Sequence, residues 1–126
     1  MRKNLLTIIL LAFISIASFG QKAEVLYFKA NLPCCPAKAC NQLEADIKEI
    51  IKNNFSDDEV IFKTIKIADK KNSELINKHN AKSQTVVIVS GETAIDVSDI
   101  VKTYSRKKNK EEFKSKLIAQ INKSLE

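Results

Sequence analysis

The order in which extended and helical patterns follow one another is the feature that most limits the fold of this chain. Short runs rich in apolar and β-branched residues favour strands, and longer runs with an apolar residue every three or four positions favour helices. The expected strands cover residues 24–29, 60–67, 85–89 and 93–97. The expected helices cover residues 36–54 and 69–80 and two segments that begin near Ser98 and Asn109. The predicted order is β-α-β-α-β-β-α-α.

This order predicts an α/β fold, a four-stranded mixed sheet flanked by helices. A β-α-β unit joins parallel strands by a right-handed crossover, whereas the turn at residues 90–92 joins antiparallel strands. Segment 85–89 is rich in β-branched residues and is expected to be a central strand. Segment 60–67 is expected to be buried on both faces. Ser98 and Asn109 are expected to cap the last two helices.

The first twenty residues have the pattern of a secretory signal peptide. A basic start, Met1 to Asn4, precedes the apolar run Leu5 to Ala17, and small residues follow up to Gly20. The apolar run is shorter than the roughly 20 residues of a membrane-spanning helix, although an uncleaved anchor is the alternative. We therefore expect a signal peptide at 1–20 and one exported domain at 21–126. Its predicted location is the periplasm or cell envelope, with no stable membrane anchor after cleavage.

The charge pattern argues against a nucleic-acid partner. The chain has 21 Lys and Arg against 15 Asp and Glu, a net charge of +6, and most lysines are scattered among acidic residues. One basic cluster, at residues 106–108, lacks the interleaved aromatic residues of nucleic-acid interfaces. We therefore interpret the lysines as part of an ordinary solvated surface.

Three cysteines, Cys34, Cys35 and Cys40, lie between the first expected strand and the first expected helix. Thiols outside the cytosol tend to form disulfides, and an odd number leaves at least one thiol for a partner, a metal or a mixed disulfide. A helix N-terminus lowers the pKa of a nearby thiol and makes it more reactive. Cys35 is the expected helix cap, and Cys34 is expected to be exposed just before it. Cys40 shares the apolar helix face of Leu43 and Ile47 and is expected to be buried.

The spacing of these cysteines restricts their pairing. In a regular helix, the Cα atoms of Cys35 and Cys40 lie about 8–9 Å apart, and a disulfide needs less than about 7 Å. A bridge to Cys40 therefore requires an irregular first turn, and a Cys34–Cys35 bridge would be strained. The three thiolates could instead converge on a soft ion such as Cu(I), Hg(II) or As(III). His79, the single histidine, is remote in sequence and is expected to occupy an ordinary surface position.

The element order, with thiols after the first strand, resembles the minimal thioredoxin-like fold. Segments 65–69 and 78–92 are similar to the middle and end of a thioredoxin domain. Segments 25–28, 100–104 and 112–114 resemble an exported Bacteroidetes family, named the nitrophenyl compound nitroreductase subunit ArsF family. The resemblance implies thiol-disulfide chemistry at Cys34, Cys35 and Cys40, but the sequence has no flavin-binding pattern that would support nitroreductase chemistry.

The chain departs from the thioredoxin pattern in two ways. No cysteine pair has the Cys-x-x-Cys spacing, because Ala37 lies three residues after Cys34 and three before Cys40. The proline that precedes the central strand of thioredoxins, and that faces the thiols there, corresponds to Gln84. The resemblance implies that losing this proline removes part of a substrate-peptide platform and opens room near the thiols.

Three functions fit these patterns. The first is an exported thiol-disulfide redox protein, with no cofactor, in which Cys34 or Cys35 attacks and Cys40 resolves. Its partner would be a redox protein or a thiol substrate. The second is a protein that binds a soft metal ion or arsenite through the same three thiolates. The third is an accessory subunit of thioredoxin-like fold without catalysis.

Overall fold

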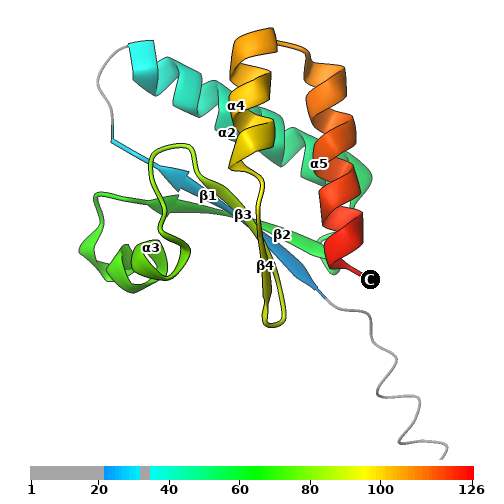
Figure 1. Ribbon diagram of the computed structural model, residues 1–126, viewed down its shortest axis with the longest axis horizontal. Coiled ribbons are helices and arrows are strands. Elements are labelled where there is room, and N and C mark those ends of the chain that lie inside the picture. Colours follow the sequence, from blue (N-terminus) through cyan, green and yellow to red (C-terminus); the bar gives the residue numbers. More distant parts are fainter. Residues whose placement is uncertain (1–21, 32–34) are drawn as a thin grey trace, which may run out of the picture.

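The computed structural model describes residues 22–31 and 35–126 (Figure 1). The strands are β1 (Ala23–Lys29), β2 (Val60–Lys66), β3 (Val86–Ser90) and β4 (Thr93–Asp96). The helices are α2 (Cys35–Asn54), the short 3-10 helix η1 (Lys70–Asn72), α3 (Ser73–His79), α4 (Ser98–Lys107) and α5 (Lys110–Ser124). The predicted order of strands and helices is confirmed.

The four strands form one mixed sheet in the order β2-β1-β3-β4. β1 runs parallel to β2, with Ala23 opposite Val60, and antiparallel to β3, with Leu26 opposite Val87. β3 and β4 form an antiparallel hairpin that turns at Gly91. This is the thioredoxin-like arrangement that the element order predicts, and it confirms β3 as a central strand.

The prediction that the second strand is buried on both faces is wrong in part. β2 lies at an edge of the sheet, and Val60 is its one buried residue. The crossover through α2 places β2 beside β1, and no described strand pairs with its outer side. Its apolar residues pack on both faces of the sheet, Phe62 on one and Ile65 on the other, but these two stay half-buried at the edge, and Lys63 and Lys66 are exposed. Apolar content alone did not distinguish an edge strand from a central one.

Helices cover the two faces of the sheet unequally (Figure 1). α2, α4 and α5 lie on one face, and α3 with η1 lies on the other. Alternate residues of a strand point to opposite faces, so Val25 and Tyr27 enter the first layer while Leu26 and Phe28 enter the second. The larger core, between sheet and three helices, includes these fully buried side chains: Ile47, Ile88, Leu117 and Ile121.

The capping predictions had different outcomes. Asn109 caps α5, because its side chain accepts a hydrogen bond of 3.1 Å from the backbone N–H of Glu112. Ser98 is the first residue of α4 and not its cap. The Asp96 carboxylate accepts the Ser98 N–H at 2.8 Å, and the Ser98 hydroxyl accepts the N–H of Val86 at 3.4 Å. The Ser98 hydroxyl thus pairs with a β3 donor instead of a helix donor.

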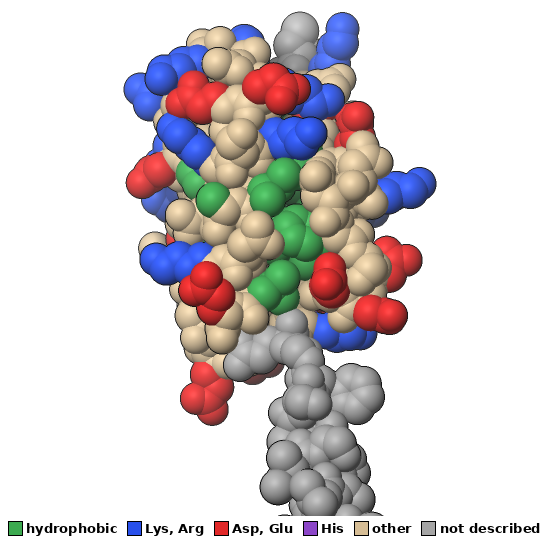
Figure 2. All heavy atoms as spheres, turned by 90° about the vertical axis from the view of Figure 1, so that its right-hand side faces the viewer, with side chains coloured by type: hydrophobic (Ala, Val, Ile, Leu, Met, Phe, Trp, Pro, Cys, Tyr) green, Lys and Arg blue, Asp and Glu red, His purple; other side chains and the backbone are tan. Residues whose placement is uncertain are grey.

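The surface is highly charged. Figure 2 shows Lys, Arg, Asp and Glu side chains surrounding a narrow strip of apolar side chains on one face. Within the described part of the chain, no helix combines the length and the apolar character needed to cross a membrane. The predicted signal peptide, residues 1–20, lies outside the described residues.

The substitution Ile47→Ala tests how much the core depends on α2. Ile47 is fully buried between α2 and the sheet, so shortening it should lower the free energy of unfolding by about 2–5 kcal/mol. Chemical denaturation monitored by circular dichroism measures this loss. The neighbouring exposed Lys48→Ala should change stability by less than about 0.5 kcal/mol. Equal effects of the two substitutions would contradict the packing described here.

Candidate functional site

The structure describes one of the three predicted thiols in full. Cys34 lies outside the described residues, and so does the side chain of Cys35. α2 begins at Cys35, so Cys35 is the first residue of the helix and not, as expected, the cap that precedes it. Cys40 lies in the second turn of α2, is 1% exposed and forms no disulfide. The predicted burial of Cys40 is confirmed.

Gln84 lies against the sulfur of Cys40. Its side-chain amide Nε2 donates to Cys40 Sγ at 3.6 Å. The Gln84 backbone N–H donates to the carbonyl of Phe28 at 2.9 Å, and the Phe28 N–H donates to the carbonyl of Thr85 at 2.9 Å. These two bonds fix the Gln84 loop to the end of β1. The residue at the position of the thioredoxin proline therefore faces a thiol, as the resemblance implies.

The loop holds Gln84 in an unusual backbone conformation. Its φ of 66° lies in the left-handed region, which costs a residue with a Cβ about 1–2 kcal/mol. Lys82 and Thr85 close the loop, since the Lys82 N–H donates to Thr85 Oγ1 at 2.9 Å and the Thr85 N–H to the Lys82 carbonyl at 3.1 Å. No described peptide bond is cis. The approach of Gln84 to Cys40 thus depends on local hydrogen bonds and a positive φ.

Tyr27 joins β1 to α2 at Cys40. Its hydroxyl, fully buried, donates to the backbone carbonyl of Cys40 at 3.0 Å. Burial raises the pKa of Tyr27 most, and the neighbouring Cys40 and the charge of Glu44 raise it further. Tyr27 therefore stays protonated and remains a hydrogen-bond donor across the physiological pH range.

An ion pair lies one helical turn beyond Cys40. Lys29 Nζ, at the end of β1, is 2.9 Å from Glu44 Oε2 on α2, and each side chain is a little over a quarter exposed. At this exposure the pair contributes at most about 1 kcal/mol to stability. The pair matters more for its position, because it places one positive and one negative charge close to the contact between Tyr27 and Cys40. Sequence patterns give no signal for a pair between a strand end and a helix.

A second polar cluster connects α2 to α4 and α5. Asp46 is 3% exposed, and it accepts hydrogen bonds from the Tyr104 hydroxyl at 2.8 Å and from Gln42 Nε2 at 3.0 Å. Lys110 Nζ lies 3.6 Å from the same carboxylate. The Tyr104 ring stacks on Phe113 with centroids 4.4 Å apart. Asp46 therefore fixes the position of the C-terminal half of α4 against the middle of α2.

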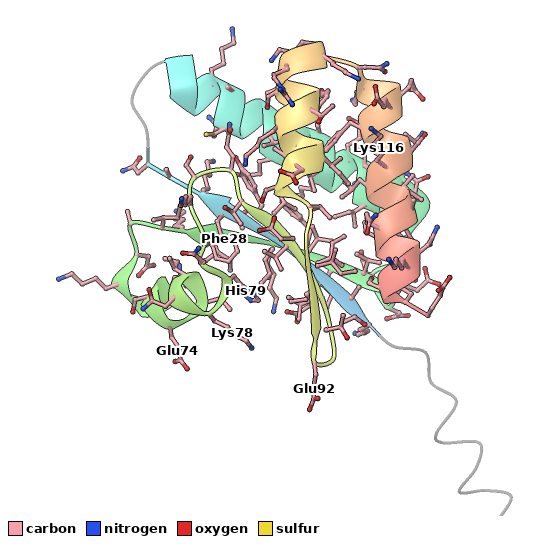
Figure 3. The ribbon with its side chains drawn as sticks, in the orientation of Figure 1. Phe28, Glu74, Lys78, His79, Glu92 and Lys116 are labelled. Carbon is pink, nitrogen blue, oxygen red and sulfur yellow. The ribbon has the colours of Figure 1, made fainter. Side chains whose placement is uncertain are left out.

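His79 does not belong to the thiol site. Its ring lies 6.1 Å from that of Phe28, on the sheet face opposite α2 (Figure 3). The residue is half-buried, so the predicted ordinary surface position is wrong in part. Burial lowers its pKa, and the nearby Lys78 lowers it further. The His79 ring packs near Phe28 on the apolar face of the sheet. A single histidine in a sequence gives no signal for such a contact.

The described residues contain no group of three or more His, Cys, Asp or Glu side chains that could hold a metal ion. The predicted soft-metal set of Cys34, Cys35 and Cys40 extends outside those residues and stays a prediction.

The continuous helix from Cys35 bears on disulfide formation. It places the Cα atoms of Cys35 and Cys40 about 8–9 Å apart, beyond the reach of a disulfide.

Comparison with known proteins shows that the fold of this chain is similar to that of several solved structures. No protein-family model matches the sequence, and no curated protein matches it. One similar solved structure is thioredoxin-2, a component of the malaria parasite protein secretion machinery. It has 15% identity and a TM-score of 0.46 over 71% of this chain and 86% of that chain. A thioredoxin from Thermus thermophilus has 14% identity and a TM-score of 0.40, over 60% of this chain and 58% of that chain.

A thioredoxin-like protein from Clostridium perfringens also has 14% identity and a TM-score of 0.40, over 71% of this chain and 73% of that chain. The fold of this chain is thioredoxin-like, as its own strand order and strand directions establish. The resemblance to the ArsF family stays a prediction.

The reactivity of Cys40 tests its burial. In a Cys34→Ser/Cys35→Ser variant, Cys40 is the one remaining thiol, and its reaction with a maleimide should be at least about tenfold slower in the folded protein than in denaturant. Adding Gln84→Gly, which suits the positive φ and removes the side chain at the sulfur, should speed labelling of the folded protein. Equal labelling rates with and without denaturant would contradict the described site.

The substitution Tyr27→Phe tests the bond to the Cys40 carbonyl. Removing the hydroxyl leaves the ring in place and should lower the free energy of unfolding by about 0.5–1.5 kcal/mol. Labelling of Cys40 in the Cys34→Ser/Cys35→Ser background should also accelerate, because α2 is held less firmly there. Tyr104→Phe, which removes a hydroxyl on α4, is the matched control and should leave Cys40 labelling unchanged. An accelerated rate in the control alone would overturn this role for Tyr27.

Proposed function

We propose that this protein is an exported thiol-disulfide redox protein of thioredoxin-like fold, working in the periplasm or cell envelope. Cys34 or Cys35 is the attacking thiol, Cys40 is the resolving thiol, and the partner is a redox protein or a thiol substrate. The single observation that carries the proposal is the position of Cys40. It is a buried thiol near the start of the helix that follows β1, in contact with Gln84. The proposal includes membership of the exported ArsF family, which rests on the segments named above.

The redox step balances as two successive exchanges. The thiolate of Cys34 or Cys35 attacks one sulfur of the partner's disulfide, forms a mixed disulfide and releases the partner's other sulfur as a thiolate. The Cys40 thiolate then attacks the sulfur of Cys34 or Cys35, forms an internal disulfide and releases the partner's second thiolate. The partner gains two electrons and, on protonation, two protons; this chain loses the same number. The reverse sequence oxidises a dithiol partner.

The helix geometry sets a condition on the second exchange. With α2 regular from Cys35, the Cα distance to Cys40 is too long for a bridge. The first turn of α2 must therefore open when Cys35 is the attacking thiol, and the loop must fold over the helix end when Cys34 is. A disulfide that requires this rearrangement is strained, and strained disulfides are reduced easily. We accordingly expect the oxidised form to be an oxidant.

Trapping of mixed disulfides tests this function. In a Cys40→Ser variant the first exchange can occur and the second cannot, so covalent adducts with envelope proteins should accumulate and disappear on reduction. Non-reducing electrophoresis followed by mass spectrometry detects them. The Cys34→Ser/Cys35→Ser/Cys40→Ser variant is the matched control and should give none. The wild-type protein should also catalyse reduction of insulin by dithiothreitol.

Two results would overturn the proposal. The first is the absence of both adducts and insulin reduction. The second is stoichiometric binding of Cu(I) or arsenite by the reduced protein, abolished by each single substitution at Cys34, Cys35 and Cys40, in a protein without exchange activity. That result would favour the soft-metal alternative.

A further inference from the structure

A groove opens beside Gln84, between α2 and the C-terminal end of α4. Its volume is about 370 Å³, within the roughly 300–1,000 Å³ of small-ligand sites. Ala39 and Leu43 contribute apolar surface from α2, and Gln84 contributes its side chain from the loop before β3. Because Gln84 also donates to Cys40 Sγ, one side chain borders both the groove and the buried thiol. A ligand in the groove therefore lies next to the proposed redox site.

The lining of the groove carries two unpaired cations. Lys38 on α2 and Lys108 after α4 both line it, both are exposed, and neither forms an ion pair with a described residue. Asp46 is the one carboxylate in the lining. Tyr104 and Gln42 donate to it, and Lys110 lies 3.6 Å away, so its charge is already compensated. The lining is consequently positive at its rim, and Ala39 and Leu43 add apolar surface among the polar residues of α2.

The fold fixes one of these cations at the groove. Lys108 ends α4 with a φ of 57°, and its N–H donates to the Tyr104 carbonyl at 2.8 Å. It belongs to a basic turn of the chain, residues 106–110, which contains four cations. Lys107 and Lys110 have carboxylate partners on α5 and α2, whereas Arg106 and Lys108 have none among the described residues. One residue of the basic cluster noted in the sequence, Lys108, thus lines the groove.

We propose that this α2–α4 groove binds an acidic, extended peptide segment of the redox partner, on the far side of Gln84 from the buried thiol of Cys40. The identity of the partner rests on the proposed redox function, whereas the binding of an acidic peptide does not. Carboxylates on the segment pair with Lys38 and Lys108, and an apolar side chain contacts Ala39 and Leu43. Charge complementarity of this kind raises association rates and selects partners more than it raises affinity.

Peptide binding tests the groove without any redox step. The probes are two dye-labelled, cysteine-free peptides of 12 residues, one rich in Asp and Glu with two leucines, the other with Asn and Gln in place of the acids. Fluorescence anisotropy with the reduced protein should show at least about fivefold tighter binding of the acidic peptide at low salt. The difference should shrink at 0.5 M NaCl, because salt screens exposed charges.

A charge-reversed pair of variants locates the site. Lys38→Glu/Lys108→Glu should abolish the preference for the acidic peptide. Lys48→Glu/Lys70→Glu is the matched control, since it changes the net charge equally at two exposed lysines outside the groove, and it should retain most of the preference. Equal affinity of the wild-type protein for both peptides, or an equal loss in both variants, would overturn the proposal.

Disulfide-containing versions of the two peptides separate this inference from the proposed function. The wild-type protein should reduce the acidic one with the lower KM, and Lys38→Glu/Lys108→Glu should raise that KM at least about fivefold while leaving the neutral peptide's kinetics unchanged. Reduction of both peptides with equal KM would contradict peptide binding in the groove and support the redox function. Tight binding of the acidic peptide without reduction of either peptide would contradict the redox function and support peptide binding in the groove.

Discussion

The contact of α2 with β1 is the constraint on which the rest of the site depends. Ile47 and its apolar neighbours bury one face of α2 against the sheet, and the Tyr27 hydroxyl fixes the helix at the Cys40 carbonyl. With the helix fixed there, Cys40 must face inward, and the Gln84 loop meets it from the start of β3. The order of the strands brings this loop beside the end of β1. Packing at this helix–strand contact thus restricts the chemistry of Cys40. The same helix also sets the distance between the Cα atoms of Cys35 and Cys40.

The sequence predicted the architecture because its local signals agreed. The β-branched run at 85–89 indicated a central strand, and the periodic spacing of Leu43 and Ile47 indicated the buried helix face that Cys40 shares. The edge position of β2 escaped prediction, because Val60 and Phe62 are as apolar as residues of a central strand. Strand neighbours are decided by the crossover and not by composition. Ser98 was misassigned for a related reason, since the hydroxyl found a tertiary donor on β3 instead of a helix N–H.

Less of the site than of the fold was predictable. Burial of Cys40 followed from helix periodicity. The thioredoxin resemblance implied open room near the thiols at Gln84, but the Gln84 side chain extends to the sulfur of Cys40. The contacts of Lys29 with Glu44, and of Asp46 with Tyr104, did not follow from the sequence, because each pair joins elements whose distance depends on the completed fold. The groove beside Gln84 has the same origin. Its two cations, Lys38 and Lys108, are far apart in the sequence. The fold brings them to one groove because α4 ends beside α2.

The hydrogen bond from Tyr27 ends on the main-chain carbonyl of Cys40, a group that is present whatever the state of the sulfur. The Cys40 thiol also lies close enough to the same hydroxyl to raise its pKa. A bond to the main chain persists when a side chain is replaced, whereas the interaction with the thiol does not. The attachment of α2 to β1 therefore has one part that is independent of the side chain at position 40 and one part that changes with the charge of its sulfur.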